Sequence, residues 1–368
     1  MIRTFDWRDL GLVRTLGERG VCLDSSTGLT RGAQPLQNAL MDYLMPGTGT
    51  PTLVGRPEGK NGGEGAVFGQ LQHRPRHEQA HVLFIAPHYT PSVTHTWLAL
   101  VDNLAEEAGQ RGAHNLIAEV NEDSAEFEAL RTAGFAIYAR QSLWKLGAGE
   151  ELPSPPQDVP LRPAKNIDGI GVHTLYSNIV PRLVQQVEQL PRHISQGFVL
   201  EQGSETIAFL DVKRGPLGIW IEPYLHPEAY DLSEAVLHTC LSLVPNHSTK
   251  PVYLCVRRYQ DWLQEIVARA GFKLMESQAV MVKRLAVRLA EPLLKPLTVA
   301  EGQVPTPLVR AQLDARDDER PARTAPLTRR TRLDGLSDHA KTNHRRSPRL
   351  DGRYPSQHRG GPQRCQSY

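Results

Sequence analysis

Two histidines and a glutamate stand at residues 77–81 in the order HEQAH, which matches the zinc-binding pattern H-E-x-x-H. On a long helix this spacing places two imidazoles one turn apart as metal ligands, with the glutamate beside them as a general base. Here Pro75 closely precedes the motif, and His81 leads directly into VLFIAP, an apolar run typical of a strand. We therefore expect His73, His77 and His81 to lie along a β-hairpin, and we expect no metal site.

Two glycine-containing stretches resemble phosphate-binding loops. GKNGGEG at 59–65 lacks the G-K-[ST] ending of such a loop and lies between two candidate strands, so it predicts a hairpin turn. GQRGA at 109–113 follows a predicted helix, and the dipole at a helix C-terminus repels a phosphate. We expect neither stretch to bind phosphate.

The composition is that of an ordinary globular protein. The chain has 368 residues, of which 40% are hydrophobic, enough for two domains with a core each. Its four cysteines show no C-x-x-C spacing, which favours free thiols in a reducing compartment. The N-terminus has no apolar signal segment, and no apolar run approaches the roughly 18 residues that span a bilayer. These features predict a cytoplasmic protein with no membrane partner, and they indicate no oligomeric state.

The apolar spacing in residues 1–150 predicts a regular series of helices and strands. The series begins with a strand at 2–5, two short helices within 8–20 and 35–47, and three strands at 51–57, 65–73 and 81–87. The face of a longer helix is then marked by Trp97, Val101, Leu104 and Ala108. A strand at 115–120, a short helix capped by Ser124 and stopped at Gly134, and a last alternating strand complete it.

The same order recurs after a proline-rich break, ELPSPPQDVP, which predicts an extended linker at 151–158. The repeat is clearest where LRTAGFAIYARQSLWKL at 130–146 matches ARAGFKLMESQAVMVKRL at 268–285. Gln141 and Gln278 each follow their Ala-Gly-Phe stop at the same spacing. Two unrelated segments that each end a helix at a glycine and then begin a strand would also look alike. The whole order of elements favours a duplication, with domains at 1–150 and 159–290.

Residues 291–368 have a different character, with 15 Lys and Arg against 9 Asp and Glu and few large apolar residues. Such a composition buries too little surface to offset the entropy of ordering, so we expect a disordered basic tail. The pairs Arg329-Arg330 and Arg345-Arg346 would neutralise nucleic-acid phosphates. Acidic residues are interspersed among them, however, and no interleaved aromatic residues offer base stacking, so a nucleic acid is not the expected partner.

In the order of its elements the chain resembles the GNAT-type N-acetyltransferase superfamily. IAEVNEDSAEFEALRTAGFAIYARQSLWKL at 117–146 looks like that family's fifth strand, fourth helix and closing strands, and 252–285 looks like a second, more diverged copy. The resemblance implies an α/β (α+β) protein with two tandem GNAT-like acyl-CoA N-acyltransferase folds. Each would be a twisted, mostly antiparallel sheet flanked by helices.

The resemblance also implies an activity and a site. The family transfers an acetyl or acyl group from acyl-CoA to an amine by direct attack in a ternary complex, so a small-molecule or peptide amine is the implied acceptor and acetyl-CoA the implied co-substrate. In the first copy the implied cofactor contacts are the backbone of Ile85 and Ala86 and the hydroxyls of Ser92 and Thr94. The implied catalytic candidates are Tyr89 as a proton donor, with Tyr138, Tyr224 and Tyr259 as alternatives for that role, and Glu119 and Asn121 orienting the amine.

Both copies depart from the family's pattern where CoA would bind. The family places a glycine-rich loop before its third helix, whose N–H groups hold the pyrophosphate. The corresponding segments here, FIAPHYTPSVTHTWLAL and IWIEPYLHPEAYDLSEA, contain no glycine, and their prolines remove N–H donors. The family's usual tyrosine position is occupied by Leu130 and Val267. Two functions therefore stay open: an N-acyltransferase, and a catalytically inactive tandem protein used for binding or as a scaffold.

Overall fold

The computed structural model describes residues 1–45, 50–57, 65–75, 77–150, 157–190 and 194–285. All of them belong to one compact unit, Met1–Leu294. Most of the predicted linker and all of the predicted disordered tail lie outside the described residues. No helix in the described ranges combines the length and the apolar content needed to cross a bilayer.

The first half of the chain contains the predicted series and two further elements. In order these are β1 (Ile2–Thr4), η1 (Trp7–Asp9), α1 (Leu10–Gly17), β2 (Val21–Cys22), α2 (Ser25–Arg31), α3 (Pro35–Leu44), β3 (Thr52–Gly55), β4 (Val67–His73), β5 (Gln79–Ala86), η2 (Pro91–Val93), α4 (Thr94–Gln110), β6 (Asn115–Asn121), α5 (Ala125–Thr132) and β7 (Ala136–Leu146). The elements that the apolar pattern does not predict are β2 and α2.

The second half repeats this order. Its elements are β8 (Arg162–Pro163), η3 (Asn166–Asp168), α6 (Gly169–Ile179), α7 (Arg182–Gln185), η4 (Ile194–Gln196), β9 (Phe198–Gln202), β10 (Glu205–Arg214), β11 (Ile219–Leu225), η5 (Pro227–Leu232), α8 (Ser233–Leu243), β12 (Val252–Arg257), η6 (Arg258–Gln260), α9 (Leu263–Arg269) and β13 (Lys273–Arg284). The predicted interruption at Pro181 separates α6 from α7.

The repeat is visible in side-chain contacts as well as in element order. Arg3 donates from both of its terminal nitrogens to the two carboxylate oxygens of Asp9, with N–O distances of 2.7 and 2.8 Å. Arg162 makes the same bidentate contact to Asp168 at the same two distances. Gly134 and Gly271 both have a positive φ, 86° and 91°, where the two helices stop and turn into strands. The glycine stops inferred from the sequence are therefore confirmed.

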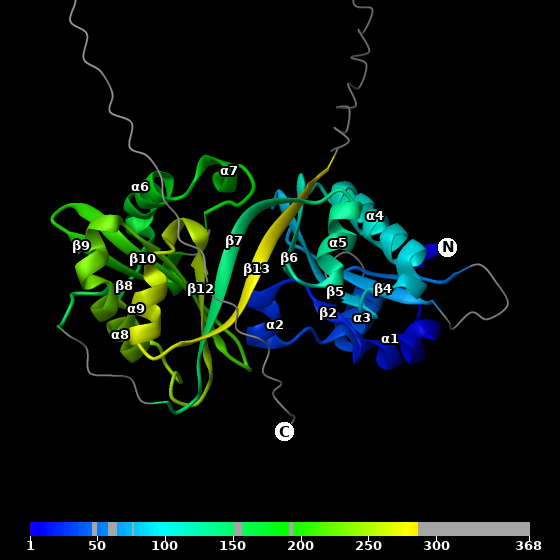
Figure 1. Ribbon diagram of the computed structural model, residues 1–368, viewed down its shortest axis with the longest axis horizontal. Helices are drawn as coiled ribbons and strands as arrows, with labels where there is room; N and C mark the ends of the chain where they lie inside the picture. Colours follow the sequence, from blue (N-terminus) through cyan, green and yellow to red (C-terminus); the bar gives the residue numbers. More distant parts are fainter. Residues whose placement is uncertain (46–49, 58–64, 76, 151–156, 191–193, 286–368) are drawn as a thin grey trace, which may run out of the picture. The chain divides into compact units, whose positions relative to one another are not determined.

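The described strands form one 13-stranded sheet in the order β1-β3-β4-β5-β6-β13-β7-β12-β11-β10-β9-β8, with β2 added beside β5 (Figure 1). The pairs β5–β6 and β11–β12 are parallel, and the other pairs are antiparallel. A mixed, mostly antiparallel sheet with flanking helices is the predicted fold class, which is confirmed.

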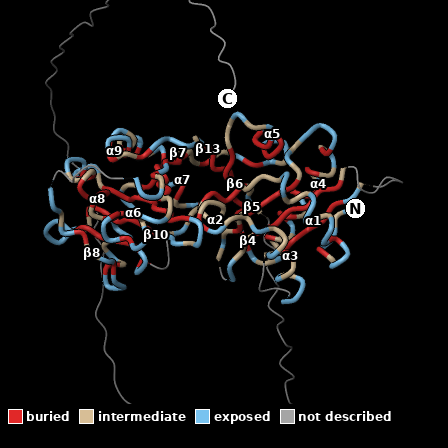
Figure 2. The backbone as a smooth tube through the Cα atoms, turned by 90° about the horizontal axis from the view of Figure 1, so that it is seen from below, coloured by how far each residue is buried: buried red, intermediate tan, exposed pale blue. Residues whose placement is uncertain are grey.

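The two halves exchange their last strands at the centre of the sheet. The closing strand of the first half, β7, pairs with β12 of the second, and β13 pairs with β6 of the first. The side chains follow the strands: Trp144 and Leu146 join the core of the second half, while Ala279 and Met281 join the core of the first. Figure 2 shows buried backbone along these central strands. Each half therefore completes its core with a strand from the other.

Candidate functional site

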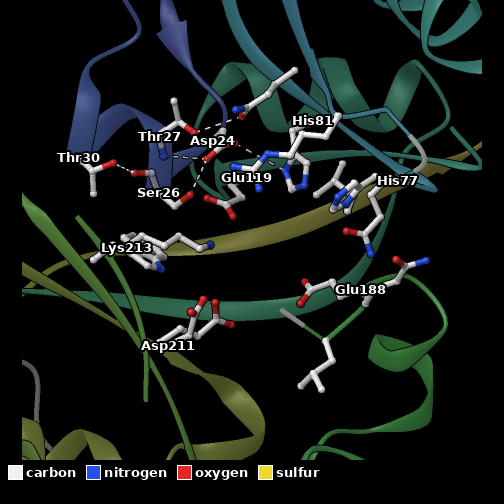
Figure 3. Close-up of a pocket in the computed structure, with 18 of the residues that line it drawn as sticks. Asp24, Ser26, Thr27, Thr30, His77, His81, Glu119, Glu188, Asp211 and Lys213 are labelled. Carbon is white, nitrogen blue, oxygen red and sulfur yellow. Dashed lines mark hydrogen bonds and ion pairs between the residues drawn. The ribbon is translucent and has the colours of Figure 1, made fainter. Parts of the chain in front are cut away.

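A polar pocket of about 360 Å³ lies over the central strands and takes its walls from both halves. Figure 3 shows side chains from α2, β6, β10 and the segment after α7 directed toward one space. The pocket lining includes Asp24, Glu119, Glu188, Asp211, Lys213, Trp220, Glu222 and Arg257. A volume of this size suits a small metabolite-sized molecule.

The floor of this pocket is acidic. Four carboxylates that line it are buried, with 4–8% of their surface exposed, and the buried base that faces them is Arg257, at 6%. Asp211 and Glu222 are direct cross-strand partners on β10 and β11. Like charges placed opposite each other in a sheet are destabilising. The residues of this acidic floor are Asp24, Glu119, Asp211 and Glu222.

Arg257 is the centre of a buried ionic network. Its Nε donates to Glu222 Oε1 at 3.2 Å and its Nη2 to Glu188 Oε1 at 2.8 Å, while the Tyr138 hydroxyl donates to the same Glu188 oxygen. Burial alone would lower the pKa of Arg257, but the attraction of Glu188 and Glu222 outweighs it and raises that pKa. The third nitrogen, Nη1, is buried without a hydrogen-bond partner among the described residues.

Two floor carboxyl groups have pKa values raised above the ordinary value. Burial raises the pKa of Glu119, and the nearby Asp24 charge adds to that effect. Burial likewise raises the pKa of Asp211 to about 6, with Glu222 raising it further and Lys213 opposing it. A cation bound between these groups would favour their charged forms. The pocket is thus suited to a positively charged ligand.

Helix α2 supplies one wall of the pocket through its N-terminus. Asp24 caps it, because its Oδ1 accepts from the Thr27 N–H at 3.0 Å, as an N-cap side chain should. Glu119 Oε2 accepts from the Ser25 N–H at 2.8 Å, which ties the start of the helix to β6. The Ser25 hydroxyl donates to Gln278 on β13 at 3.0 Å. These contacts fix Asp24 and Glu119 next to each other.

The two glutamines marked by the sequence repeat meet at the centre of the sheet. Gln141 and Gln278 are cross-strand partners, and the Gln141 amide donates to Gln278 Oε1 at 2.9 Å. Cys255 Sγ in turn donates to Gln141 Oε1 at 3.3 Å. Equivalent positions of the two halves therefore contact each other, as expected at the axis of an internal duplication.

Strands β5 and β6 separate after three paired positions, the last being His81 with Ile117. The opening between them, here called the first wedge, is filled by the chain itself. The Leu23 N–H donates to Leu83 O at 3.0 Å and Leu23 O accepts from the Glu119 N–H at 2.8 Å, so Leu23 bridges the two strands. Val21 pairs with Ile85. Backbone groups along the first wedge are thus already hydrogen-bonded.

Strands β11 and β12 also separate after three paired positions, the last being Ile221 with Leu254. In this opening, here called the second wedge, the side-chain amide of Gln260 forms hydrogen bonds with backbone groups of β11. Its Oε1 accepts from the Leu225 N–H at 2.8 Å, and its Nε2 donates to Pro223 O at 2.7 Å. Gln260 is 2% exposed, so both contacts are shielded from water.

Of the seven predicted site residues, Glu119 alone lines the pocket, and of the alternative proton donors Tyr138 and Tyr224 also line it. Tyr89 packs its ring edge-on against Trp97 at 5.5 Å, and its hydroxyl accepts from Thr94 Oγ1 at 3.2 Å. Ser92 Oγ lies 2.9 Å from Thr90 Oγ1 at the start of α4. These three predicted residues therefore gather around the α4 N-terminus, away from the pocket.

The other predicted residues have structural contacts. Asn121 Oδ1 accepts from the Asp123 N–H at 2.8 Å and so shapes the turn into α5. Ile85 and Ala86 are buried in β5, where they pair with Gly69 and Phe68 of β4. Their assignment to a cofactor, like that of Ser92 and Thr94, stays a prediction.

Two floor residues that are not among the predicted site residues nevertheless carry a signal in the sequence. Asp211 and Glu222 are acidic residues inside the apolar strand runs FLDVK and WIEPY. A charge in such a run is costly to bury and therefore points to a site. Glu119, in the run IAEV, carries the same signal, but it is predicted from the family resemblance, as a residue at the end of a strand.

The HEQAH motif does not lie on a helix. His73 ends β4 and pairs with Ala80, while His81 lies within β5, so the hairpin expected from the sequence is confirmed. Within the described ranges no group of three or more His, Cys, Asp or Glu is placed to hold a metal ion.

Comparison with solved structures identifies the architecture. A GCN5-related N-acetyltransferase from Sphaerobacter thermophilus superposes with a TM-score of 0.52 at 13% identity, over 77% of this chain and 95% of that chain. The GCN5-related glucosamine N-acetyltransferase region of a fungal multi-domain GH3 β-N-acetylglucosaminidase gives 0.50 at 12% identity, over 77% of this chain and 38% of that chain. This chain has the GNAT fold. No protein-family model matches the sequence, and no curated protein matches it.

The two wedges lie at corresponding places in the two halves. In each half a parallel strand pair opens beside the pocket, and the order of elements is the one implied by the resemblance. At the present identities the likeness concerns the fold, and the chemistry has to be argued from this chain's own residues.

Proposed function

We propose that this protein binds an amine in the central pocket. The observation that carries the proposal is the acidic floor, in which four buried carboxylates face one buried guanidinium. Even with the exposed Lys213 counted, negative charges outnumber positive ones there. Buried carboxylates without enough partners raise the free energy of the folded state, and a bound ammonium group would lower it.

The class of ligand agrees with the fold. Both solved structures described above are named as N-acetyltransferases, and one of them is named for glucosamine, which carries an amine. An amine ligand is therefore what a GNAT fold with an acidic pocket favours. The pocket takes its side chains from both halves of the chain.

Acyl transfer from acyl-CoA to that amine is the second candidate. It is favoured by the fold, because the two solved structures described above are both named as N-acetyltransferases. Leu23 and Gln260 already bond backbone groups in the two wedges, so acetyl-CoA could bind there only by displacing these contacts. We therefore place binding before catalysis and assign no transfer step to Tyr89 or Asn121.

The proposal is tested by calorimetric titration of the full chain with pentylamine, a simple primary amine. We expect saturable binding, and at least a tenfold weaker affinity in Glu119→Gln, equivalent to about 1.4 kcal/mol. The amide keeps an acceptor for the Ser25 N–H but removes the charge. Glu128→Gln, at an exposed position of α5, is the matched control and should bind as the unaltered chain does.

Thermal unfolding of the full chain with and without excess acetyl-CoA separates the two candidates. A specific ligand at 100 times its Kd adds about 2.7 kcal/mol to the folded state, so binding would raise the melting temperature clearly. We expect no such shift. A shift would place the acyltransferase first, whereas pentylamine binding that survives Glu119→Gln unchanged would remove the acidic floor as the basis of the proposal.

A further inference from the structure

The rim of the pocket carries the opposite charge to its floor. Four basic side chains that line the pocket are exposed, and they come from α2, from the residue after β4, and from β10. They are Arg31, Arg74, Lys213 and Arg214. A ligand whose only charged group is an ammonium would offer these basic side chains no anion to bind, and they would repel it as it entered the pocket.

Two buried donors that line the pocket also lack partners. Arg257 Nη1 and Trp220 Nε1 form no hydrogen bond to any described residue, although the side chains are only 6% and 2% exposed. A buried donor left unpaired costs about 1–3 kcal/mol, so such groups are rare unless a ligand or water satisfies them. Both need an acceptor, which an amine ligand does not provide in its charged form.

The unpaired donors and the acidic floor lie close together in the sheet. Trp220 is the cross-strand partner of Lys213, and Asp211 is the cross-strand partner of Glu222, two positions further along the same strands. Residues two apart on a strand share a face. Sites for a cation and for an anion are therefore adjacent on one face of β10 and β11.

We propose that the ligand is a small zwitterion, with an oxyanion such as a carboxylate as well as the amine. The amine would lie against the acidic floor, and the oxyanion would accept from Lys213, Trp220 Nε1 and Arg257 Nη1. This inference rests on the proposed amine-binding function and adds the second charged group. A molecule with both groups fits the described charges better than an amine of the same length.

The test compares three probes of equal chain length: 5-aminopentanoate, pentylamine and pentanoate. Calorimetric titration of the full chain should give a Kd for 5-aminopentanoate at least tenfold lower than that for pentylamine, since one charge-assisted hydrogen bond is worth about that factor. Lys213→Met, which keeps the length of the side chain but not its charge, should bring the two affinities together.

Trp220→Phe removes only the indole N–H and part of the ring, and it should reduce the preference for 5-aminopentanoate severalfold. Trp144→Phe is its matched control, because Trp144 Nε1 is also buried without a described partner but does not line the pocket. The control should keep the full preference. Equal loss in both variants would assign the effect to packing and overturn the role of Trp220.

The outcomes separate this inference from the proposed function. Equal affinity for 5-aminopentanoate and pentylamine would overturn the zwitterion and leave amine binding in place. Binding of pentanoate as tight as that of 5-aminopentanoate, with no effect of Glu119→Gln, would overturn amine binding itself. Binding of none of the three probes up to millimolar concentration would overturn both.

Discussion

At the residue scale, the informative feature is a carboxyl group placed where its charge is disfavoured. Asp211 is 4% exposed and directly opposite Glu222, and burial raises its pKa to about 6. Relative to its ordinary value of 3.8, the folded state holds this proton more tightly. The contribution of Asp211 to stability is therefore complete below pH 3.8 and is lost as the pH rises through about 6.

Asp211 should make amine binding depend on pH. Because a bound ammonium favours the ionised carboxylate, we expect the affinity for pentylamine to rise between pH 5 and pH 7, by up to tenfold per unit below 6 for one linked proton. Asp211→Asn should flatten this dependence without abolishing it, since Glu119 also has a raised pKa. Titration at four pH values measures the slope. Asp231→Asn, on exposed η5, is the control, and a slope equal in all three proteins would contradict the assignment.

At the element scale, the sequence predicts most helices and strands but not how the wedges are filled. Apolar period and glycine stops are local, so they identify the strands of both halves. The apolar period does not reveal helix α2, because SSTGLTR holds a single large apolar residue, Leu29. The helix is held by the Asp24 cap, by the contacts of Ser25 to β6 and β13, and by packing against β10 and β11. The two-residue strand β2 gives no periodic signal at all. The first wedge is therefore filled by the segment that contains β2 and leads into α2, and these are the two elements that the apolar pattern does not predict.

Gln260 offers the cleaner test of a filled wedge, because a single side chain is involved. Gln260→Ala leaves Leu225 N–H and Pro223 O without their partner in a buried place, at a cost of about 1–3 kcal/mol for each group. We expect the free energy of unfolding, measured in urea, to fall by about 2–4 kcal/mol. Gln264→Ala, whose contact to Asp261 is exposed, should change it by less than about 0.5 kcal/mol. Equal, small effects would mean that water replaces the Gln260 amide.

At the scale of the whole unit, the sequence indicates a duplication and the structure adds the exchange of strands. The apolar alternation in β7 and β13 determines which of their faces are buried, but it contains no information on which strand lies next to them. The pocket could not be predicted for the same reason, since Glu119 and Asp211 belong to different halves. The division into domains at 1–150 and 159–290 therefore stays a prediction about the sequence, while the sheet is continuous across it.

Because each core contains a strand from the other half, we expect the halves to unfold together. Leu104→Ala opens a cavity in the core of the first half and should cost about 2–5 kcal/mol. Hydrogen exchange in β10 and β11 should then lose protection by the same free energy as in β4 and β5. Leu237→Ala in α8, within the other core, should have the reciprocal effect. Loss of protection confined to the altered half would show that β7 and β13 detach before either core opens, and the two halves would then be independent folding units.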